Sequence, residues 1–147
     1  MKELIKQILP YGDEFLMIDT VHFLEGSQIL ASKEITEGMV KGHFDGFPIT
    51  PAITVIEGIG QSATLLLRYL LKHPYDKDIL AYRIRNSRFL NPIIPPKKVY
   101  FLVSLLKKDS KFPEIKGEAF ADNNLVAEVE LTLAIVDKNS FRQKWSK

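Results

Sequence analysis

The sequence predicts an α+β fold in which an antiparallel sheet wraps around one long central helix. Segments with strand-like patterns occupy both ends of the chain, two before residue 40 and four after residue 78. Between them lies one long apolar segment that is typical of a buried helix. We expect a single domain over residues 1–137, because 147 residues with 46% hydrophobic content can build one core.

The N-terminal part predicts a short helix and a hairpin. Residues 4–9 (LIKQIL) favour a helix that Pro10 and Gly12 end. Residues 15–24 (FLMIDTVHFL) and 29–35 (ILASKEI) are rich in aromatic and β-branched residues, and the turn sequence EGSQ separates them. We therefore expect two antiparallel strands that turn close to the glycine of that sequence.

A long central helix is predicted from Thr50 to about Lys72. The side-chain oxygen of Thr50 can cap the first turn, and Pro51 suits the first helical position because it has no amide hydrogen to leave unbonded. The pair His73 and Pro74 then ends the helix. The segment is apolar nearly all round, so we expect it to be buried.

One narrow polar stripe interrupts this apolar helix. Its members recur at steps of three and four residues, so they share one face. They are Thr54, Glu57, Gln61, Thr64 and Arg68. Two interpretations of the lone glutamate stay open, namely charge pairing within the core or an acid placed in a cleft for proton transfer.

Four further strands are predicted after the helix. Their patterns cover residues 79–90, 97–108, 112–122 and 124–137, and clusters of turn-forming residues separate them. The last ten residues, 138–147, form a polar, basic C-terminal tail outside the domain.

Composition excludes several classes of function. A formal net charge of +2 provides no global field for nucleic acid. The absence of cysteine excludes disulfides, thiolate metal sites and a cysteine nucleophile. The first residues do not resemble a signal peptide, and no apolar segment reaches membrane-spanning length without a polar break. We expect a cytoplasmic protein with no membrane or nucleic-acid partner.

A histidine stands out in the stretch KGHFDGFPITPAITVIEGIGQ. A loop histidine is commonly a surface residue or one with satisfied hydrogen bonds, and that interpretation of His43 stays open. Against it, Gly42 and Gly46 allow the backbone to turn tightly and to approach a ligand. Phe44 and Phe47 can shield the same place from water. The pattern indicates a candidate catalytic histidine.

The stretch from Gly42 to Gln61 resembles the signature of the β-hydroxyacyl-acyl-carrier-protein dehydratases of the FabZ and FabA type. The family pattern is similar to G-H-F-P-G-x-P-x-M-P-G, followed by an acidic residue and then a glutamine on a helix. Two weaker matches flank it, since LPYGDEFLMIDTV is similar to L-P-H-R-Y-P-F-L-L-I-D and SRFLNPIIPPKK is similar to A-R-F-x-x-P-V-x-P-G-D. The resemblance covers most of the chain and implies the hot-dog fold.

The resemblance implies an elimination shared between two subunits, in a homodimer or an assembly of dimers. His43 would remove the C2 proton of a 3-hydroxyacyl thioester, and Glu57 of the partner subunit would protonate the departing C3 hydroxyl to leave the trans-2-enoyl thioester. Gln61 would orient the Glu57 carboxyl. The backbone amide of Ala52 would hold the enolate oxygen, with Gly42 as further support. No metal or other cofactor is required.

The same resemblance implies an acyl tunnel and an acyl carrier protein that presents its phosphopantetheine-linked chain. The residues expected to bind substrate are Phe44, Phe47, Pro51, Ile53, Phe89 and Ile93, and Phe15 and Ile56 would also line the tunnel. The residues expected to dock the acidic carrier are Arg83, Arg85, Arg88, Lys97 and Lys98. Each set also has a plainer interpretation, as ordinary core or as solvated strand faces.

The chain departs from the family pattern at several positions. Ala52 replaces the usual glycine, and residues 11–14 (YGDE) stand where the family has His-Arg-Tyr-Pro. These departures favour a specialised enzyme of a pigment, polyene or polyketide pathway over the housekeeping fatty-acid enzyme. Two alternatives stay open, a hot-dog thioesterase in which Glu57 activates water and a non-catalytic acyl-binding or heterodimer partner subunit.

Overall fold

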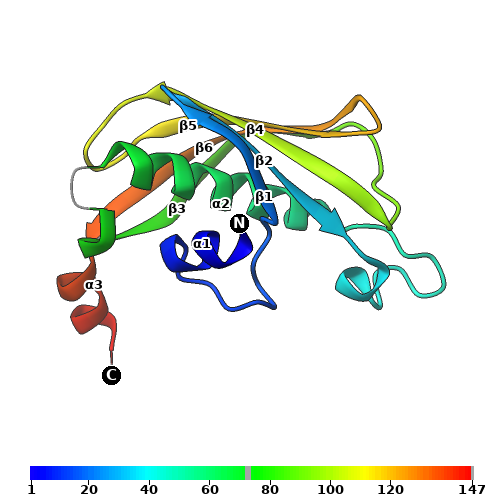
Figure 1. The fold of residues 1–147 in the computed structure, drawn as a ribbon, viewed down its shortest axis with the longest axis horizontal. Coiled ribbons are helices and arrows are strands. Elements are labelled where there is room, and N and C mark those ends of the chain that lie inside the picture. Colours follow the sequence, from blue (N-terminus) through cyan, green and yellow to red (C-terminus); the bar gives the residue numbers. More distant parts are fainter. Residues whose placement is uncertain (72–73, 147) are drawn as a thin grey trace.

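A six-stranded antiparallel sheet curves around one long helix, α2, as predicted (Figure 1). The computed structural model describes residues 1–71 and 74–146. Along the chain the elements are α1 (Lys2–Ile8), β1 (Thr20–Glu25), β2 (Gln28–Ile35), η1 (Glu37–Val40), α2 (Ala52–Leu70), η2 (Pro74–Asp76), β3 (Lys77–Phe89), β4 (Lys97–Lys107), β5 (Glu114–Ala121), β6 (Asn124–Asp137) and α3 (Lys138–Trp145). The strand order is β1-β2-β4-β5-β6-β3, so β1 and β3 form the two edges.

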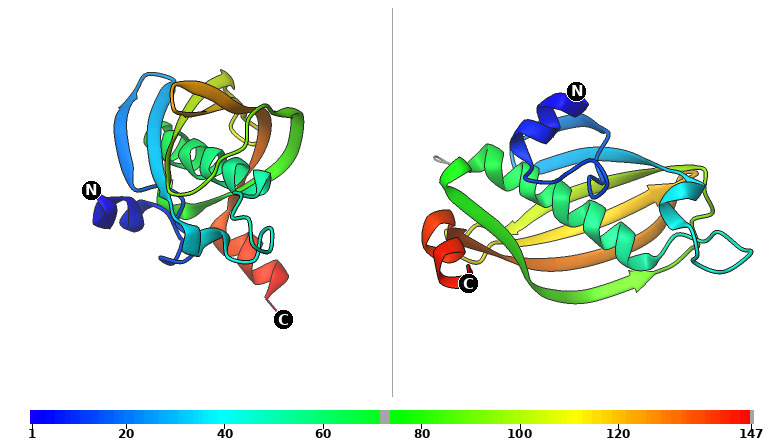
Figure 2. Two further views of the ribbon diagram at one scale, coloured as in Figure 1. Left: turned by 90° about the vertical axis from the view of Figure 1, so that its right-hand side faces the viewer. Right: turned by 90° about the horizontal axis from the view of Figure 1, so that it is seen from below.

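Helix α2 packs directly against the concave face of the sheet, which Figure 2 shows from two further sides. Two glycines allow this close approach. A Cβ atom on Gly58 would lie 2.2 Å from Cζ of Phe101 on β4, and one on Gly117 of β5 would lie 2.2 Å from Cγ2 of Ile59. Phe101 and Ile59 are fully buried at this contact, which forms the centre of the core.

The central helix begins one residue later than expected, because Pro51, which was expected at the first helical position, is the N-cap in place of Thr50. Helix α2 begins at Ala52, and Pro51 is its N-cap with an extended backbone, φ −59° and ψ 135°. Thr50 therefore lies too far out to cap the first turn, and its buried hydroxyl has no hydrogen-bond partner among the described residues. Its amide instead donates to the carbonyl of Ile93 at 2.9 Å. The expected C-terminal residues Lys72 and His73 lie outside the described residues.

The expected hairpin forms and turns at Gly26, but its first strand starts at Thr20 and not at residue 15. The preceding segment turns back on itself, since the amides of Phe15 and Leu16 both donate to the carbonyl of Gly12. The buried side chain of Gln61 then binds the backbone of Phe15 and Met17. A helix side chain thus takes hydrogen bonds that a longer strand would have used.

Helices occupy both termini of the described chain. Helix α1 begins at Lys2, earlier than expected, and buries Ile5 against the core. The segment expected as a basic tail forms α3, whose first turn is capped by Asp137 Oδ1 accepting from the Ser140 amide at 2.9 Å. Arg142 of α3 binds both carboxylate oxygens of Asp78, at 2.8 and 2.9 Å. These contacts hold α3 at the end of the sheet opposite the loop between η1 and α2 (Figures 1 and 2).

None of the described helices combines the length and the apolar character that crossing a lipid bilayer requires.

Candidate active site

The loop between η1 and α2 holds His43 in a defined position. Gly42 and Gly46 adopt left-handed backbone angles, with φ of 88° and 76°. The loop closes on the histidine itself, because its amide donates to the Val40 carbonyl and its carbonyl accepts from the Ile49 amide, both at 3.0 Å. The two glycines therefore serve the tight turn that the sequence indicated.

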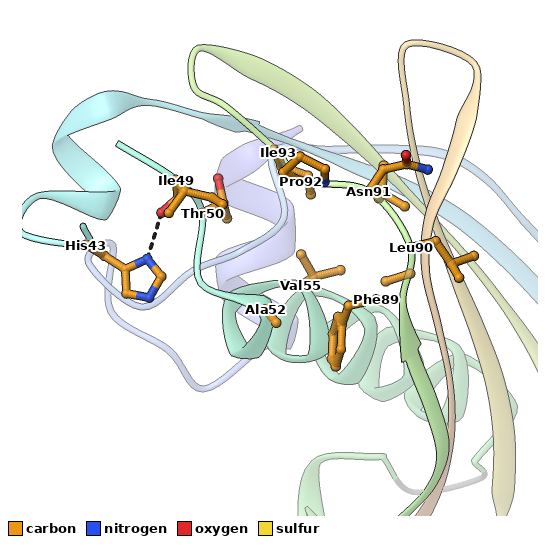
Figure 3. A pocket seen from close by; sticks show the side chains of 12 residues that line it. His43, Ile49, Thr50, Ala52, Val55, Phe89, Leu90, Asn91, Pro92 and Ile93 are labelled. Carbon is orange, nitrogen blue, oxygen red and sulfur yellow. Dashed lines mark hydrogen bonds between the residues drawn. The ribbon is translucent and has the colours of Figure 1, made fainter. Parts of the chain in front are cut away.

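The side chain of His43 is fixed in one tautomer. Its Nδ1 lies 2.9 Å from the carbonyl oxygen of Ile49 (Figure 3). A carbonyl oxygen only accepts hydrogen bonds, so Nδ1 carries a hydrogen, and in the neutral ring the lone pair therefore lies on Nε2. The ring also stacks on Phe44, with centroids 4.8 Å apart and 25° between the planes.

His43 and the first turn of α2 border one cavity of about 280 Å³, which we call the His43 cavity. Among its lining residues are Ala52, Val55, Phe89 and Ile93 (Figure 3). Ala52 is the first residue of α2, so its amide hydrogen points out of the helix without an intrahelical acceptor. A base and a helix N-terminus therefore face the same space, where they can act on one bound group.

Glu57 lies further along α2 and borders a different cavity. Its Oε1 accepts a hydrogen bond of 3.0 Å from Nε2 of Gln61, as predicted from their spacing. The cavity beside Glu57, which we call the Glu57 cavity, has a volume of about 80 Å³. Its lining residues are Tyr11, Ile56, Glu57, Gly60, Thr64, Ile79, Ala81, Ile84, Leu131 and Leu133. Within one chain, Glu57 is thus absent from the described lining of the His43 cavity.

The family-model comparison matches a FabA-like domain over residues 9–130, most of the chain. The chain belongs to the FabA-like family. A 3-hydroxyacyl-[acyl-carrier-protein] dehydratase FabZ from Campylobacter fetus is 37% identical over 142 residues, covering 91% of this FabA-like chain and 96% of the relative. The FabZ of the same name from a Nitratiruptor species is 35% identical over 142 residues, with the same coverage.

Solved structures give the same fold for this FabA-like protein. The dehydratase heterocomplex ApeI:P from Xenorhabdus doucetiae superimposes with a TM-score of 0.79 at 17% identity, over 97% of each chain. A hypothetical thioesterase with coenzyme A from Streptococcus pneumoniae superimposes with a TM-score of 0.64 at 5% identity, over 80% of this chain and 85% of the other. Both likenesses concern the fold alone, which is the hot-dog fold.

The substrate-binding residues expected in this FabA-like chain separate into two groups. Phe89 and Ile93 line the His43 cavity, and Ile56 lines the Glu57 cavity. The others lie outside the described lining of both cavities, and all but the half-buried Pro51 are exposed on the single chain. They are Phe44, Phe47, Pro51, Ile53 and Phe15, of which Ile53 is 75% exposed and Phe44 is 60% exposed.

The expected docking residues lie on two strands that are not neighbours. Arg83, Arg85 and Arg88 belong to β3, and Lys97 and Lys98 to β4, with β5 and β6 between them in the sheet. Three of the five form ion pairs within the chain. These pairs are Arg85 with Glu114 at 3.0 Å, Arg88 with Glu128 at 2.6 Å and Lys97 with Asp122 at 2.6 Å.

Sequence reasoning missed Tyr11 as part of the site. Tyr11 borders the Glu57 cavity, and burial together with the nearby Glu57 carboxylate raises the pKa of its phenol. The signal was present, because Tyr11 is the first of the residues that depart from the family pattern. Asn91 and Pro92 were also missed as lining of the His43 cavity, since the sequence marks them only as turn residues.

Proposed function

We propose that this chain dehydrates a 3-hydroxyacyl thioester, carried on acyl carrier protein, to the trans-2-enoyl thioester. The observation that carries the proposal is that His43, whose Nδ1 is hydrogen-bonded to the Ile49 carbonyl, shares one cavity with the N-terminus of α2. The curated FabZ relatives at 37% and 35% identity bear the name of this activity. The chain belongs to their family over most of its length.

The first half of the reaction uses the His43 cavity. Nε2 of His43 removes a proton from C2, and the electron pair left on C2 spreads onto the thioester oxygen. The Ala52 amide at the start of α2 donates a hydrogen bond to that oxygen, where the helix dipole also favours negative charge. The methyl group of Ala52 leaves this donor in place, so the departure from glycine is compatible with the reaction.

The second half needs an acid at C3, and Glu57 supplies it. The protonated carboxyl gives its proton to the C3 hydroxyl, which leaves as water while the electron pair from C2 forms the C2–C3 double bond. His43 has then gained one proton and Glu57 has lost one, so exchange with solvent restores both groups. Gln61 holds the carboxyl in one orientation throughout.

A second copy of the chain brings the two groups together in this proposal. His43 and Glu57 border separate cavities of one chain, so one substrate reaches both only if the partner supplies the acid. The edge strand β3 offers the contact, because it is 13 residues long and pairs with no further strand on one side among the described residues. It also carries Ile84, with 53% exposure, beside the Glu57 cavity. A two-fold pairing of such edges gives a homodimer with two composite sites.

The carrier protein and the pathway follow from the family resemblance and stay predictions. Arg83 and Lys98 form no ion pair among the described residues and are the expected docking residues still available to an acidic carrier. A cytoplasmic location and a specialised pathway stay predictions as well.

The proposal is tested by incubating the protein with a 3-hydroxyacyl thioester and identifying the product by mass spectrometry. We expect the enoyl thioester, and we expect His43→Ala and Glu57→Gln each to abolish it while circular dichroism shows an intact fold. A free acid as product would indicate a thioesterase instead. Full activity of either variant would contradict the proposal. Inactivity of the protein alone, with activity after mixing with a paralogue, would indicate a heterodimer partner.

A further inference from the structure

The two glycines of helix α2, Gly58 and Gly60, differ in whether core packing explains them. Gly58 faces the sheet, where a Cβ atom would lie 2.2 Å from Cζ of Phe101. Gly60 faces away from that contact, and a Cβ atom built on it meets nothing within 4 Å. Core packing therefore requires a glycine at position 58 and leaves the choice at position 60 unexplained.

A glycine inside a helix is unfavourable unless something requires it. Alanine at an interior helical position is favoured over glycine by roughly fivefold in the helix equilibrium. Gly60 lies in the middle of α2, has no left-handed backbone angle, and contacts no atom that an alanine would displace. The described residues thus give no packing reason for this glycine, and the space beside it is the remaining explanation.

That space is the Glu57 cavity. Gly60 lies one helical turn beyond Glu57 on the same wall. The opposite wall consists of aliphatic side chains from β3 and β6, among them the buried Ile79, Leu131 and Leu133. The hydroxyl of Thr64 donates to the Gly60 carbonyl at 3.0 Å, so its hydrogen is bound within the helix. Apart from the Glu57 carboxyl and the Tyr11 phenol, the side chains that line the cavity are therefore suited to an apolar chain.

We propose that Gly60 is a specificity-determining residue that keeps the Glu57 cavity open for the acyl carbons beyond C3. The inference rests on the proposed function, because it is the contact between Glu57 and the C3 hydroxyl that places C4 and its successors beside Gly60. The substrate class is a 3-hydroxyacyl thioester with an apolar chain longer than that of 3-hydroxybutyryl. A larger side chain at position 60 shortens the channel and leaves C1 to C4 in place.

The test measures binding first, so that it does not depend on turnover. Amide analogues of 3-hydroxybutyryl- and 3-hydroxyoctanoyl-pantetheine are titrated into the full chain by calorimetry. Burial of apolar surface strengthens binding by about fourfold per methylene group. We therefore expect the unsubstituted protein to bind the octanoyl analogue at least about tenfold more tightly than the butyryl analogue. This ratio of the two affinities should fall in Gly60→Ala and approach one in Gly60→Leu.

Matched variants separate this role from other reasons for a glycine. Tyr69→Ala changes an exposed residue of the same helix outside the Glu57 cavity and should keep the ratio. Gly60→Ala should also raise the melting temperature by about 2–4 °C, because alanine favours the helix. An unchanged ratio in Gly60→Leu would overturn the proposal. The proposal would also fail if Gly60→Leu weakened the binding of both analogues equally and analytical ultracentrifugation showed that the subunits dissociate. Gly60 would then serve to accommodate the partner subunit.

The same samples are assayed for dehydration of the two corresponding thioesters. We expect Gly60→Leu to lose kcat/KM for the octanoyl substrate by at least about tenfold and to retain the butyryl reaction. Binding that depends on chain length and on Gly60, without any dehydration, would refute the proposed function and support this inference. If the unsubstituted protein dehydrates both thioesters equally well, the proposed function would be supported and the inference about Gly60 would be refuted.

Discussion

Gln61 donates a hydrogen bond of 3.0 Å from its Nε2 to Oε1 of Glu57, one turn away on α2. The orientation of this amide is fixed from its other side, since Oε1 of Gln61 accepts from the Met17 amide at 2.8 Å. Nε2 also donates to the carbonyl of Phe15 at 2.9 Å. Glu57 Oε1 is held as an acceptor, so in the proposed reaction Oε2 is the oxygen that would deliver the proton. One buried amide thus couples the N-terminal segment to the acid.

Replacement of Gln61 by methionine should reduce both stability and activity. The substitution leaves the Met17 amide and the Phe15 carbonyl without their partner, which costs about 2–4 kcal/mol in the free energy of unfolding. It also frees the Glu57 carboxyl, so dehydration should fall by at least about tenfold. Urea unfolding and product assays measure the two effects. Ser62→Ala, at a buried residue whose hydroxyl only donates to the Gly58 carbonyl, should cost less than about 1 kcal/mol.

Gly58→Ala should destabilise the protein through one contact. Its Cβ would lie 2.2 Å from Cζ of Phe101, so the helix must move off the sheet. Overpacking of this kind costs about 1–3 kcal/mol, measured by urea unfolding. Adding Phe101→Leu to the variant should recover part of the loss, because the ring atoms in the way are removed. No recovery in the double variant would show that the strain lies elsewhere.

The contact between Arg142 and Asp78 should make the packing of α3 against the sheet depend on pH. The hydrogen bonds from Arg142 lower the pKa of Asp78, with smaller contributions from Lys138 and Arg68. A carboxyl with a lowered pKa stabilises the fold above its unfolded value and loses that contribution as the pH falls through the folded value. Arg142→Gln should therefore lower the urea concentration at the unfolding midpoint at pH 7 and hardly change it below the pKa of Asp78.

Lys144→Gln is the control for that experiment, since Lys144 lies on the same helix and contacts the ring of Trp145. It should change stability little at either pH. An Arg142→Gln effect that is equally large in acid would mean that the side chain acts by packing and not by its charge.

Charge reversal at Arg83 should weaken the binding of the carrier-bound substrate and not that of the free pantetheine substrate. Arg83 is exposed and has no ion pair among the described residues, whereas Arg88 is paired with Glu128 at 2.6 Å. Arg83→Glu should raise KM severalfold for the carrier thioester and leave the free pantetheine thioester unchanged, with a larger effect at low salt. Arg88→Gln should change the carrier KM less. Equal effects on both substrates would place Arg83 outside a docking surface.

The sequence predicted the sheet, the central helix and the bond between Gln61 and Glu57, because these depend on local periodicity and on spacing along one helix. It missed features that depend on residues far apart in the chain. The first strand is shortened because Gln61 binds the backbone of Phe15 and Met17. The C-terminal helix docks because Arg142 reaches Asp78, 64 residues away in sequence.

The exposure of several apolar residues could not be predicted from the sequence. Ile53 and Phe44 were expected to bind substrate, yet they lie on the surface of this chain. The predicted cap by Thr50 is wrong for a local reason. The extended backbone of Pro51 places the first turn of α2 beyond the reach of the Thr50 side chain. The family resemblance implied that His43 and Glu57 of one chain do not meet, but the two separate cavities that they border are visible only in the folded chain.

The most direct test of the composite site is complementation between two inactive variants. His43→Ala and Glu57→Gln are mixed under conditions that exchange subunits, and heterodimers are verified by native mass spectrometry. Each heterodimer contains one site with both substitutions and one intact site, so random mixing should restore about a quarter of the original dehydration rate. No activity in a sample with verified heterodimers would contradict the account, because His43 and Glu57 would then have to come from the same chain.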